Sequence, residues 1–226
     1  EMRTALLAAV GHDLRTPLAA VKAAVSSLRQ HDVSWTEQQT EELLATIESS
    51  ADRLQHLVTN LLDASRLQAG IVAVAPEPVS LEEVLDQALI TLDEPNRVRT
   101  EIPETLPNLW ADLGLAERVL ANLLDNAVRH TPAEAAVTIR GSLSEDMVLC
   151  EVIDHGPGIP RHLWSQIFSP FQHFDDHQAG GLGLGLAVAR GLTDAMGGSL
   201  NPALTPGGGL TMQLRLPTNS AASSPA

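Results

Sequence analysis

Apolar side chains recur at steps of three and four residues along the first seventy positions of this 226-residue chain. They form two stripes, which are Leu7, Val10, Leu14, Leu18, Val21, Val25 and Leu28, then Leu43, Ile47, Ala51, Leu54, Val58 and Leu61. This period predicts two long amphipathic helices, and the break at residues 31–35 predicts a short turn between them. One hairpin covers both stripes poorly, so we expect residues 1–70 to pair with a second copy as a four-helix bundle, which makes the protein a homodimer.

The pattern changes at residue 71 to short mixed elements, which predicts an α+β sandwich over residues 71–218. The expected strands are residues 71–74, 98–102, 109–110, 137–140, 147–153 and 210–216. Helices are expected after Ser80, which forms a capping box with Glu83, after Asp112, and over residues 186–196. Residues 219–226 are rich in Ser, Ala and Pro and are expected to be a disordered tail. The predicted fold is therefore a two-domain one, an all-α hairpin followed by an α+β sandwich.

Charge and composition limit the classes of partner. The formal net charge of −14 argues against nucleic acid or an anionic lipid surface as the main partner. Cys150 is the only cysteine, and its apolar neighbours favour a buried small side chain rather than a disulfide or zinc ligand. No stretch reaches the roughly 20 apolar residues of a membrane span. Because the chain begins inside a helical pattern, we expect a sensory or membrane part upstream and membrane contact only through it.

A histidine lies in an informative position on the first helix. His12 follows Val10 by two residues, about 200° around the helix axis, so it is expected to face away from the apolar stripe. Asp13 can accept the imidazole N–H and make the other ring nitrogen more nucleophilic. Thr16 lies one turn further on, where its hydroxyl can position a water, and Pro17 is expected to bend the helix. Position alone would equally allow an ordinary surface histidine.

Two asparagines and an aspartate suggest a second site. Asn122 and Asn126 are one helical turn apart, and amide oxygens bind hard cations and phosphates without adding charge. Asp154 ends the most apolar strand candidate and precedes Gly156 and Gly158, a turn that allows close backbone approach. Taken singly, these are weak signals, because an Asn pair is usually an exposed face and a turn aspartate is common.

Three glycines lead directly into the last predicted helix. Gly181, Gly183 and Gly185 leave free N–H groups at a helix N-terminus, where phosphates bind. A dinucleotide-binding fold would also use such glycines, but it places them after the first strand of a βαβ unit, which is not the case here.

Together these motifs resemble the boxes of the bacterial sensor histidine kinases, in the same order along the chain. Residues 12–18 resemble the H box, 122–126 the N box, 154–158 and 181–185 the two G boxes, and 168–174 the F box. The resemblance covers residues 1–217. It implies a dimeric phosphotransfer hairpin followed by an ATP-binding domain of the GHKL type, the catalytic region of such kinases.

The resemblance also implies a reaction. The γ-phosphoryl group of ATP would pass to an imidazole nitrogen of His12, with Asp13 as general base, and then to an aspartate of a separate response regulator. Asp13 and Thr16 match the family's D-x-x-T arrangement for dephosphorylating that regulator. Such a kinase core would be the cytoplasmic domain of an inner-membrane sensor.

The resemblance assigns roles in the nucleotide site. Asn126 would ligate Mg²⁺, Asn122 would lie beside the phosphates, and Arg129 would supply positive charge. His130 stands where the family often has tyrosine. Asp154 would accept a hydrogen bond from the adenine amino group, which selects adenine over guanine.

Residues 168–180 are expected to form a mobile lid over ATP. Many relatives carry an arginine or lysine there, whereas this chain has His173 and His177, which are interpreted as loop residues rather than a metal pair.

Two rival functions stay open on sequence alone. An ATPase of the gyrase, Hsp90 and MutL kind shares the sandwich, but it activates water with a glutamate at the position of Asn122. A dimerisation module without activity would not need intact Asn126, Asp154 and glycines.

Overall fold

The computed structural model describes residues 2–30, 32–171 and 183–218, with the backbone alone at residues 2–10, 12 and 13. The chain divides into two compact units, Glu1–Asp63 with Pro170–Leu184 and Ala64–Ser169 with Gly185–Ala226. The predicted fold class, a helical hairpin followed by an α+β domain, is confirmed.

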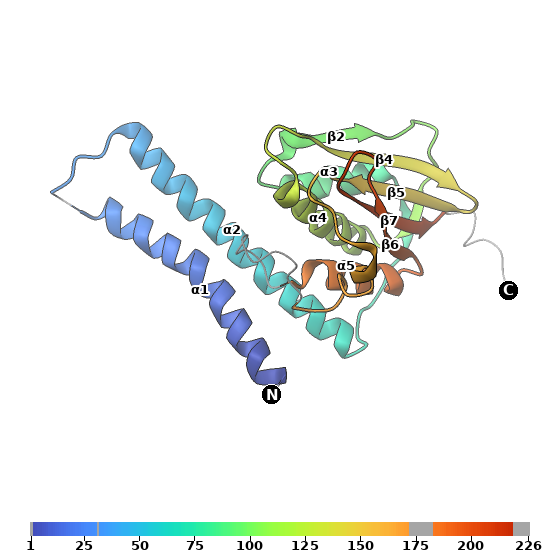
Figure 1. Ribbon diagram of the computed structural model, residues 1–226, viewed down its shortest axis with the longest axis horizontal. Coiled ribbons are helices and arrows are strands. Elements are labelled where there is room, and N and C mark those ends of the chain that lie inside the picture. The colour runs from blue at the N-terminus through green and yellow to red at the C-terminus, as the bar shows by residue number, and fades with distance from the viewer. Residues whose placement is uncertain (1, 31, 172–182, 219–226) are drawn as a thin grey trace. The chain divides into compact units, whose positions relative to one another are not determined.

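The hairpin consists of α1 (Met2–Leu28) and α2 (Glu37–Gln68), which run antiparallel (Figure 1). Thr36 and Gln39 form a capping box before α2, because the Gln39 amide donates to Thr36 Oγ1 at 3.2 Å and the Thr36 amide donates to Gln39 Oε1 at 3.0 Å. Trp35 Nε1 donates to the carbonyl of Ser27 at 3.0 Å, which ties the turn back onto α1. No described helix is both long enough and apolar enough to cross a bilayer.

Part of the apolar stripe of the hairpin is not covered within one chain. Six large apolar side chains are between 37% and 58% exposed, namely Leu18, Val25, Leu44, Val58, Leu61 and Leu62. Four of them belong to the stripes that the sequence predicts. An exposed apolar surface of this kind is typical of a site where a partner binds.

Gly70 caps the C-terminus of α2, and the segment that follows it corrects one prediction. Gly70 has φ of 65° and the Ile71 amide donates to the carbonyl of Arg66 at 3.1 Å, which is a Schellman cap. Residues 71–74 are not a strand. The run Ile-Val-Ala-Val is apolar, but it pairs with no strand, and Ile71 is 68% exposed. Strand β1 (Glu77–Val79) begins later and pairs with β3 (Leu109–Ala111).

The main sheet has five strands in the order β2-β4-β5-β7-β6. They are β2 (Val98–Glu101), β4 (Val137–Ser144), β5 (Met147–Ile153), β7 (Leu210–Pro217) and β6 (Ser199–Leu204). β2 runs parallel to β4, and the other pairs are antiparallel. β6 is absent from the sequence prediction because Pro202 interrupts its pattern, and an edge strand tolerates that proline.

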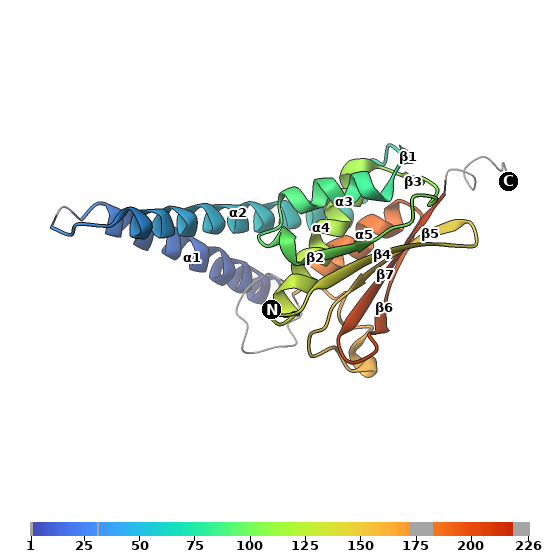
Figure 2. The same cartoon turned by 90° about the horizontal axis from the view of Figure 1, so that it is seen from above.

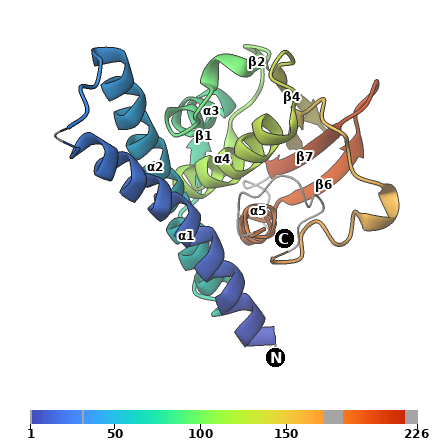
Figure 3. The ribbon, with the colours of Figure 1, turned by 60° about the vertical axis from the view of Figure 1, so that its left-hand side comes forward.

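The core lies between one face of this sheet and three helices, α3 (Leu81–Ile90), α4 (Leu113–His130) and α5 (Gly185–Ala195) (Figures 2 and 3). Burial alternates along β5, where Val148, Cys150 and Val152 are buried against the helices. Burial, and secondarily the charge of Glu151, raises the pKa of Cys150 to about 12, so the thiol stays protonated at neutral pH. Cys150 therefore acts as a small buried apolar side chain, as the sequence predicts.

Asp112 fixes the start of α4 and also the end of the linker from the hairpin. Its Oδ1 accepts from the Leu115 amide at 3.1 Å, and its Oδ2 accepts from the Ala75 amide at 2.9 Å. The N-cap predicted for α4 is confirmed, and so is the cap of α3, where Ser80 Oγ accepts from the Glu83 amide at 3.1 Å.

Replacing Asp112 with alanine is expected to lower the free energy of unfolding by about 2 kcal/mol, because the cap and the linker contact are both lost. Asp112→Asn keeps an oxygen for the cap but presents an N–H group to the Ala75 amide, so its loss should be intermediate. Urea unfolding of the three proteins measures this order. Equal stability of Asp112→Asn and the wild type would show that the linker contact contributes nothing.

Candidate functional site

The α4 helix carries both asparagines and brings Asn122 next to the start of α5. The Asn122 amide nitrogen donates to the carbonyl of Arg118 at 2.9 Å, which fixes the side-chain amide. A β-carbon at Gly185 would lie 3.0 Å from Asn122 Oδ1, so the first turn of α5 approaches this side chain closely. Asn126 lies one turn further along α4 and is half-buried. The structure therefore places Asn122 against the N-terminus of α5, where backbone N–H groups are free to bind an anion.

Asp154 is held in one orientation at the end of β5. It is 4% exposed, and its Oδ1 accepts two backbone N–H groups, from Gly156 at 2.9 Å and from Leu210 at 2.9 Å. Its own amide donates to the carbonyl of Leu210 at 3.0 Å. Among the residues that the structure describes, Oδ2 takes part in no hydrogen bond. A nearly buried carboxylate with one oxygen fixed and one free is suited to accept a hydrogen bond from a ligand.

Close packing around the turn after β5 requires glycine at three positions. A β-carbon at Gly156 would lie 2.6 Å from the carbonyl oxygen of His130, at the end of α4. Gly158 has φ of 70°, and a β-carbon there would lie 2.9 Å from the carbonyl oxygen of Gly209. Gly209, with φ of 114°, in turn packs directly against the carbonyl oxygen of Asp154. The turn therefore lies between the end of α4 and the loop before β7.

Gly209 belongs to the site, although the sequence analysis did not assign it a role. The only sequence signal is the triplet Gly207-Gly208-Gly209, which by itself indicates only a loop. All three glycines have positive φ, but the β-carbon of an alanine would meet nothing within 4 Å at Gly207 and would overlap Asp154 at Gly209.

Replacing Gly209 with alanine is expected to lower the free energy of unfolding by about 3 kcal/mol, because strain from positive φ adds to the overlap with Asp154. Gly207→Ala carries the same kind of backbone strain without the overlap and should cost about 1 kcal/mol. Chemical unfolding of both variants measures the difference. Equal losses would mean that the contact with Asp154 imposes no requirement for glycine.

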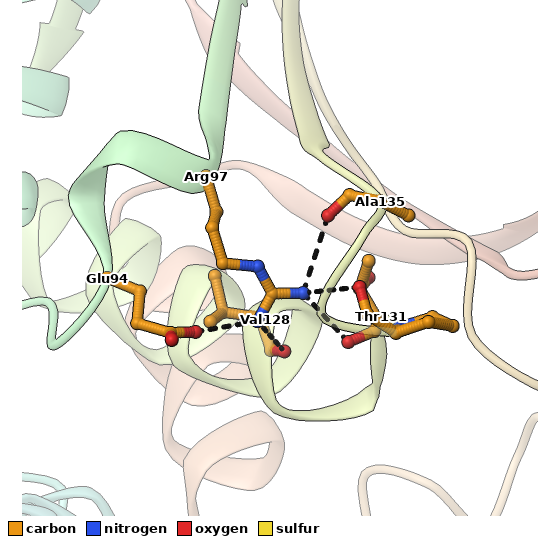
Figure 4. Close-up of polar contacts among 6 residues, drawn as sticks. Glu94, Arg97, Val128, Thr131 and Ala135 are labelled. Carbon is orange, nitrogen blue, oxygen red and sulfur yellow. Dashed lines mark hydrogen bonds and ion pairs between the residues drawn. The ribbon is translucent and has the colours of Figure 1, made fainter.

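Arg97, in the short helix η1 (Pro95–Arg97), is a further residue of this region that the sequence analysis did not identify (Figure 4). Its guanidinium donates to backbone carbonyls at the end of α4 and just beyond it, those of Thr131 at 2.8 Å, Pro132 at 2.7 Å, Ala135 at 3.4 Å and Val128 at 3.4 Å. It also forms an ion pair with Glu94 at 2.6 Å. No local motif signals this role, because the carbonyls that Arg97 binds lie more than thirty residues away.

The other predicted site residues are placed as follows. Arg129 forms an ion pair with Asp125 at 2.8 Å on α4, and Gly183 has φ of 58° and accepts a hydrogen bond from the Phe171 amide at 3.0 Å. Thr16 is exposed on α1. His12 and Asp13 lie on α1, but their side chains are outside the described part of the chain, as are Gly181, His173 and His177.

The side-chain oxygens of Asn122 and Asn126 suit a cation such as Mg²⁺ that is held mainly by the phosphates of a bound nucleotide. No group of three or more His, Cys, Asp or Glu side chains suited to a metal ion occurs in residues 2–30, 32–171 and 183–218, apart from the side chains not described. Mg²⁺ in nucleotide sites needs only one or two protein oxygens, the rest coming from phosphates and water. The amide oxygens of Asn122 and Asn126 are compatible with that arrangement.

Comparison with known families agrees with this geometry. Residues 2–70 match the family described as His Kinase A (phospho-acceptor) domain. Residues 111–220 match the family described as histidine kinase-, DNA gyrase B- and HSP90-like ATPase. The two matches follow the order of the hairpin and the α+β domain.

Several curated relatives are sensor proteins named KdpD. The chain is 47% identical to the sensor protein KdpD of Mycobacterium tuberculosis H37Rv over 96% of this chain and 26% of that protein. It is 34% identical to KdpD of Escherichia coli K12 over 98% of this chain and 25% of that protein. The chain thus spans about a quarter of the length of these relatives. Residues 11–23, 25–29 and 207–212 resemble KdpD, and these relatives confirm the similarity of the chain to that subgroup.

Solved structures share the fold. The histidine kinase ShkA, determined in complex with AMPPNP, matches with a TM-score of 0.65 at 30% identity, over 94% of this chain and 45% of that chain. The histidine kinase AdeS of Acinetobacter baumannii matches in fold with a TM-score of 0.63 at 23% identity, over 92% of this chain and 98% of that chain. With a phospho-acceptor hairpin, an ATPase domain and KdpD relatives, this chain belongs to the family of sensor histidine kinases.

Proposed function

We propose that this chain is the kinase core of a sensor protein, in which ATP bound to the α+β domain phosphorylates His12. The observation that carries the proposal is the geometry of Asp154, whose carboxylate is fixed by two backbone amides and keeps one oxygen free. In a chain that also carries the H box, such an acceptor next to a glycine turn suits recognition of adenine.

The nucleotide would lie along the line from Asp154 to the start of α5. Asp154 Oδ2 accepts a hydrogen bond from the adenine amino group, a contact that guanine cannot make because it has a carbonyl oxygen there. The phosphates lie against Asn122 and the N-terminal amides of α5 at Gly185, where the helix dipole favours negative charge. The complex of ShkA with AMPPNP, a protein of the same fold at 30% identity, supports nucleotide binding by this chain.

Asn126 would hold Mg²⁺ through its amide oxygen. When bound, the ion neutralises negative charge on the phosphates. The chain itself is acidic and offers few cationic side chains for that purpose. Arg129 contributes less positive charge than the sequence suggests, because Asp125 pairs with it on α4. Neither Gly181 nor the lid histidines enter the proposal for nucleotide binding.

The transfer step needs one nucleophile and one base on α1. An imidazole nitrogen of His12 forms the new N–P bond, the bond between the γ-phosphorus and the bridging oxygen breaks, and ADP leaves. Asp13 hydrogen-bonds the other ring N–H and stabilises the positive charge that develops on the imidazole, and it takes up the proton released by the ring. The chemistry is chiefly positioning and neutralisation of charge.

The phosphoryl group would then pass to an aspartate of a response regulator, here one similar to KdpE, since the relatives are KdpD sensor proteins. Thr16 would orient a water for the reverse activity, dephosphorylation of that regulator. By the same likeness the chain is the cytoplasmic domain of an inner-membrane sensor in potassium or osmotic signalling.

The hairpin is proposed to dimerise. Its exposed apolar side chains, which include Leu18, Val58 and Leu62, give a second copy the apolar face that a four-helix bundle buries. The same interface would bring two H boxes into one bundle.

Incubation of the wild-type chain with γ-labelled ATP and Mg²⁺ tests the proposal. A label on the protein that is lost in acid and retained in alkali supports a histidine kinase. Steady release of phosphate without labelled protein would instead indicate an ATPase of the gyrase and Hsp90 kind. Absence of nucleotide binding in calorimetry would leave only a dimerisation module.

A further inference from the structure

We propose that Arg97 is a positioning residue for the adenine end of the nucleotide site and that it acts through Thr131. The inference rests on the proposed function, because it concerns the same nucleotide, but it assigns a role to two residues outside the family's boxes. Neither residue touches the adenine in this proposal.

Arg97 holds the end of α4 through its guanidinium group. Its Nη2 donates to the carbonyl oxygens of Thr131 at 2.8 Å and Pro132 at 2.7 Å, and the side chain is only 18% exposed (Figure 4). Thr131 is the C-cap of α4, and its amide donates to the carbonyl of Ala127 at 3.0 Å. The guanidinium therefore lies at the negative end of the helix and satisfies carbonyls that lack partners inside it.

A hydrogen bond links Thr131 to the turn that carries the proposed adenine acceptor. Thr131 is 5% exposed, and its Oγ1 accepts from the amide of His155 at 3.4 Å. His155 stands between Asp154 and Gly156, and the Gly156 amide fixes Asp154 Oδ1. Because 3.4 Å is near the limit for a hydrogen bond, a small displacement of Thr131 removes it.

A steric contact also joins the end of α4 to this turn. The carbonyl of His130 lies so close to Gly156 that a β-carbon there would come within 2.6 Å of it. Any shift of the last turn of α4 is therefore transmitted to Gly156 by contact as well as through Thr131. Arg97 fixes that last turn from a segment 34 residues earlier in the sequence, so its removal should tilt the free oxygen of Asp154 away from the adenine amino group.

The planar fork of arginine explains the residue type. One nitrogen reaches the carbonyls of Thr131 and Pro132 while the other reaches Glu94 at 2.6 Å. A lysine presents a single ammonium group on a flexible stem, so it cannot contact the carbonyls and the Glu94 carboxylate at the same time. Thr131 contributes a hydroxyl acceptor, which serine retains and valine of the same shape lacks.

The test compares Arg97→Gln, Thr131→Val, Thr131→Ser and the double variant Arg97→Gln with Thr131→Val in the full chain. The control is Arg140→Gln. This variant removes an arginine from an exposed ion pair with Glu101, at 2.8 Å, between β4 and β2 of the main sheet. Calorimetry gives the dissociation constants for ADP and GDP at a temperature where circular dichroism shows each variant folded, and thermal unfolding without nucleotide is recorded in parallel.

We expect Arg97→Gln to weaken ADP binding about tenfold and Thr131→Val about fivefold, with the preference for ADP over GDP reduced in both. The double variant should bind no more weakly than Arg97→Gln alone, since both changes act on one path. Thr131→Ser and Arg140→Gln should stay within about twofold of the wild type.

Unchanged ADP affinity in Arg97→Gln and Thr131→Val, with only a lower melting temperature, would overturn the inference and leave Arg97 a purely structural residue. Additive losses in the double variant would also contradict a shared path. A wild-type chain that binds no ADP would instead contradict the proposed function, which is a separate outcome.

Discussion

His12→Gln is expected to reduce labelling of the protein by γ-labelled ATP to below about 1% of the wild-type level, because glutamine has no nucleophilic ring nitrogen. Glutamine is neutral, of similar size and a good helix former, so α1 should persist. ADP affinity should stay within about twofold, since His12 has no role in holding the nucleotide in the proposed mechanism.

The matched control for this variant is His56→Gln on α2, which makes the same chemical change on the other helix of the hairpin. It should label as the wild type does. Persistent acid-labile label on His12→Gln, or its loss in His56→Gln, would place the phosphoryl acceptor elsewhere.

Asp154→Asn is expected to weaken ADP binding by about a hundredfold or more. The asparagine oxygen can still accept the amides of Gly156 and Leu210, so the turn keeps its shape. Its amide nitrogen then faces the adenine amino group, which places one donor against another in a nearly buried position and leaves both without partners. The loss is thus larger than that of a single exposed hydrogen bond.

Asp146→Asn supplies the control, since it removes one carboxylate charge at the opposite end of β5, in the exposed β4–β5 turn. Calorimetry with ADP measures both variants, and thermal unfolding checks that Asp154→Asn is folded. Equal ADP affinity in the two variants would show that Asp154 does not bind the base, and autophosphorylation would then need another adenine site.

Local sequence patterns predicted most helices and their ends. The caps at Ser80 and Asp112 are short-range hydrogen bonds between residues three apart, so they can be read directly from the sequence. The cap at Gly70 depends on contacts that are also local in sequence. The five boxes could be recognised in the sequence because each combines several specific residue types at a fixed spacing.

Contacts between distant segments could not be predicted from the sequence. Arg97 meets Thr131, and Gly209 meets Asp154, across separations that no local motif encodes. The edge strand β6 carries Pro202 and lacks a clean alternation, whereas the apolar run at residues 71–74 has the composition of a strand and no partner to pair with. Strand formation depends on the partner as much as on the residues themselves.

Identification of the phosphorylated atom tests the central claim most directly. After incubation of the wild-type chain with ATP and Mg²⁺ at neutral pH, mass spectrometry locates the modified residue and phosphorus NMR identifies the bonded atom. The account predicts one phosphoryl group per chain at most, bonded to an imidazole nitrogen of His12. A phosphoryl group on a serine, threonine or carboxylate, or consumption of ATP with His12 unmodified, would contradict it.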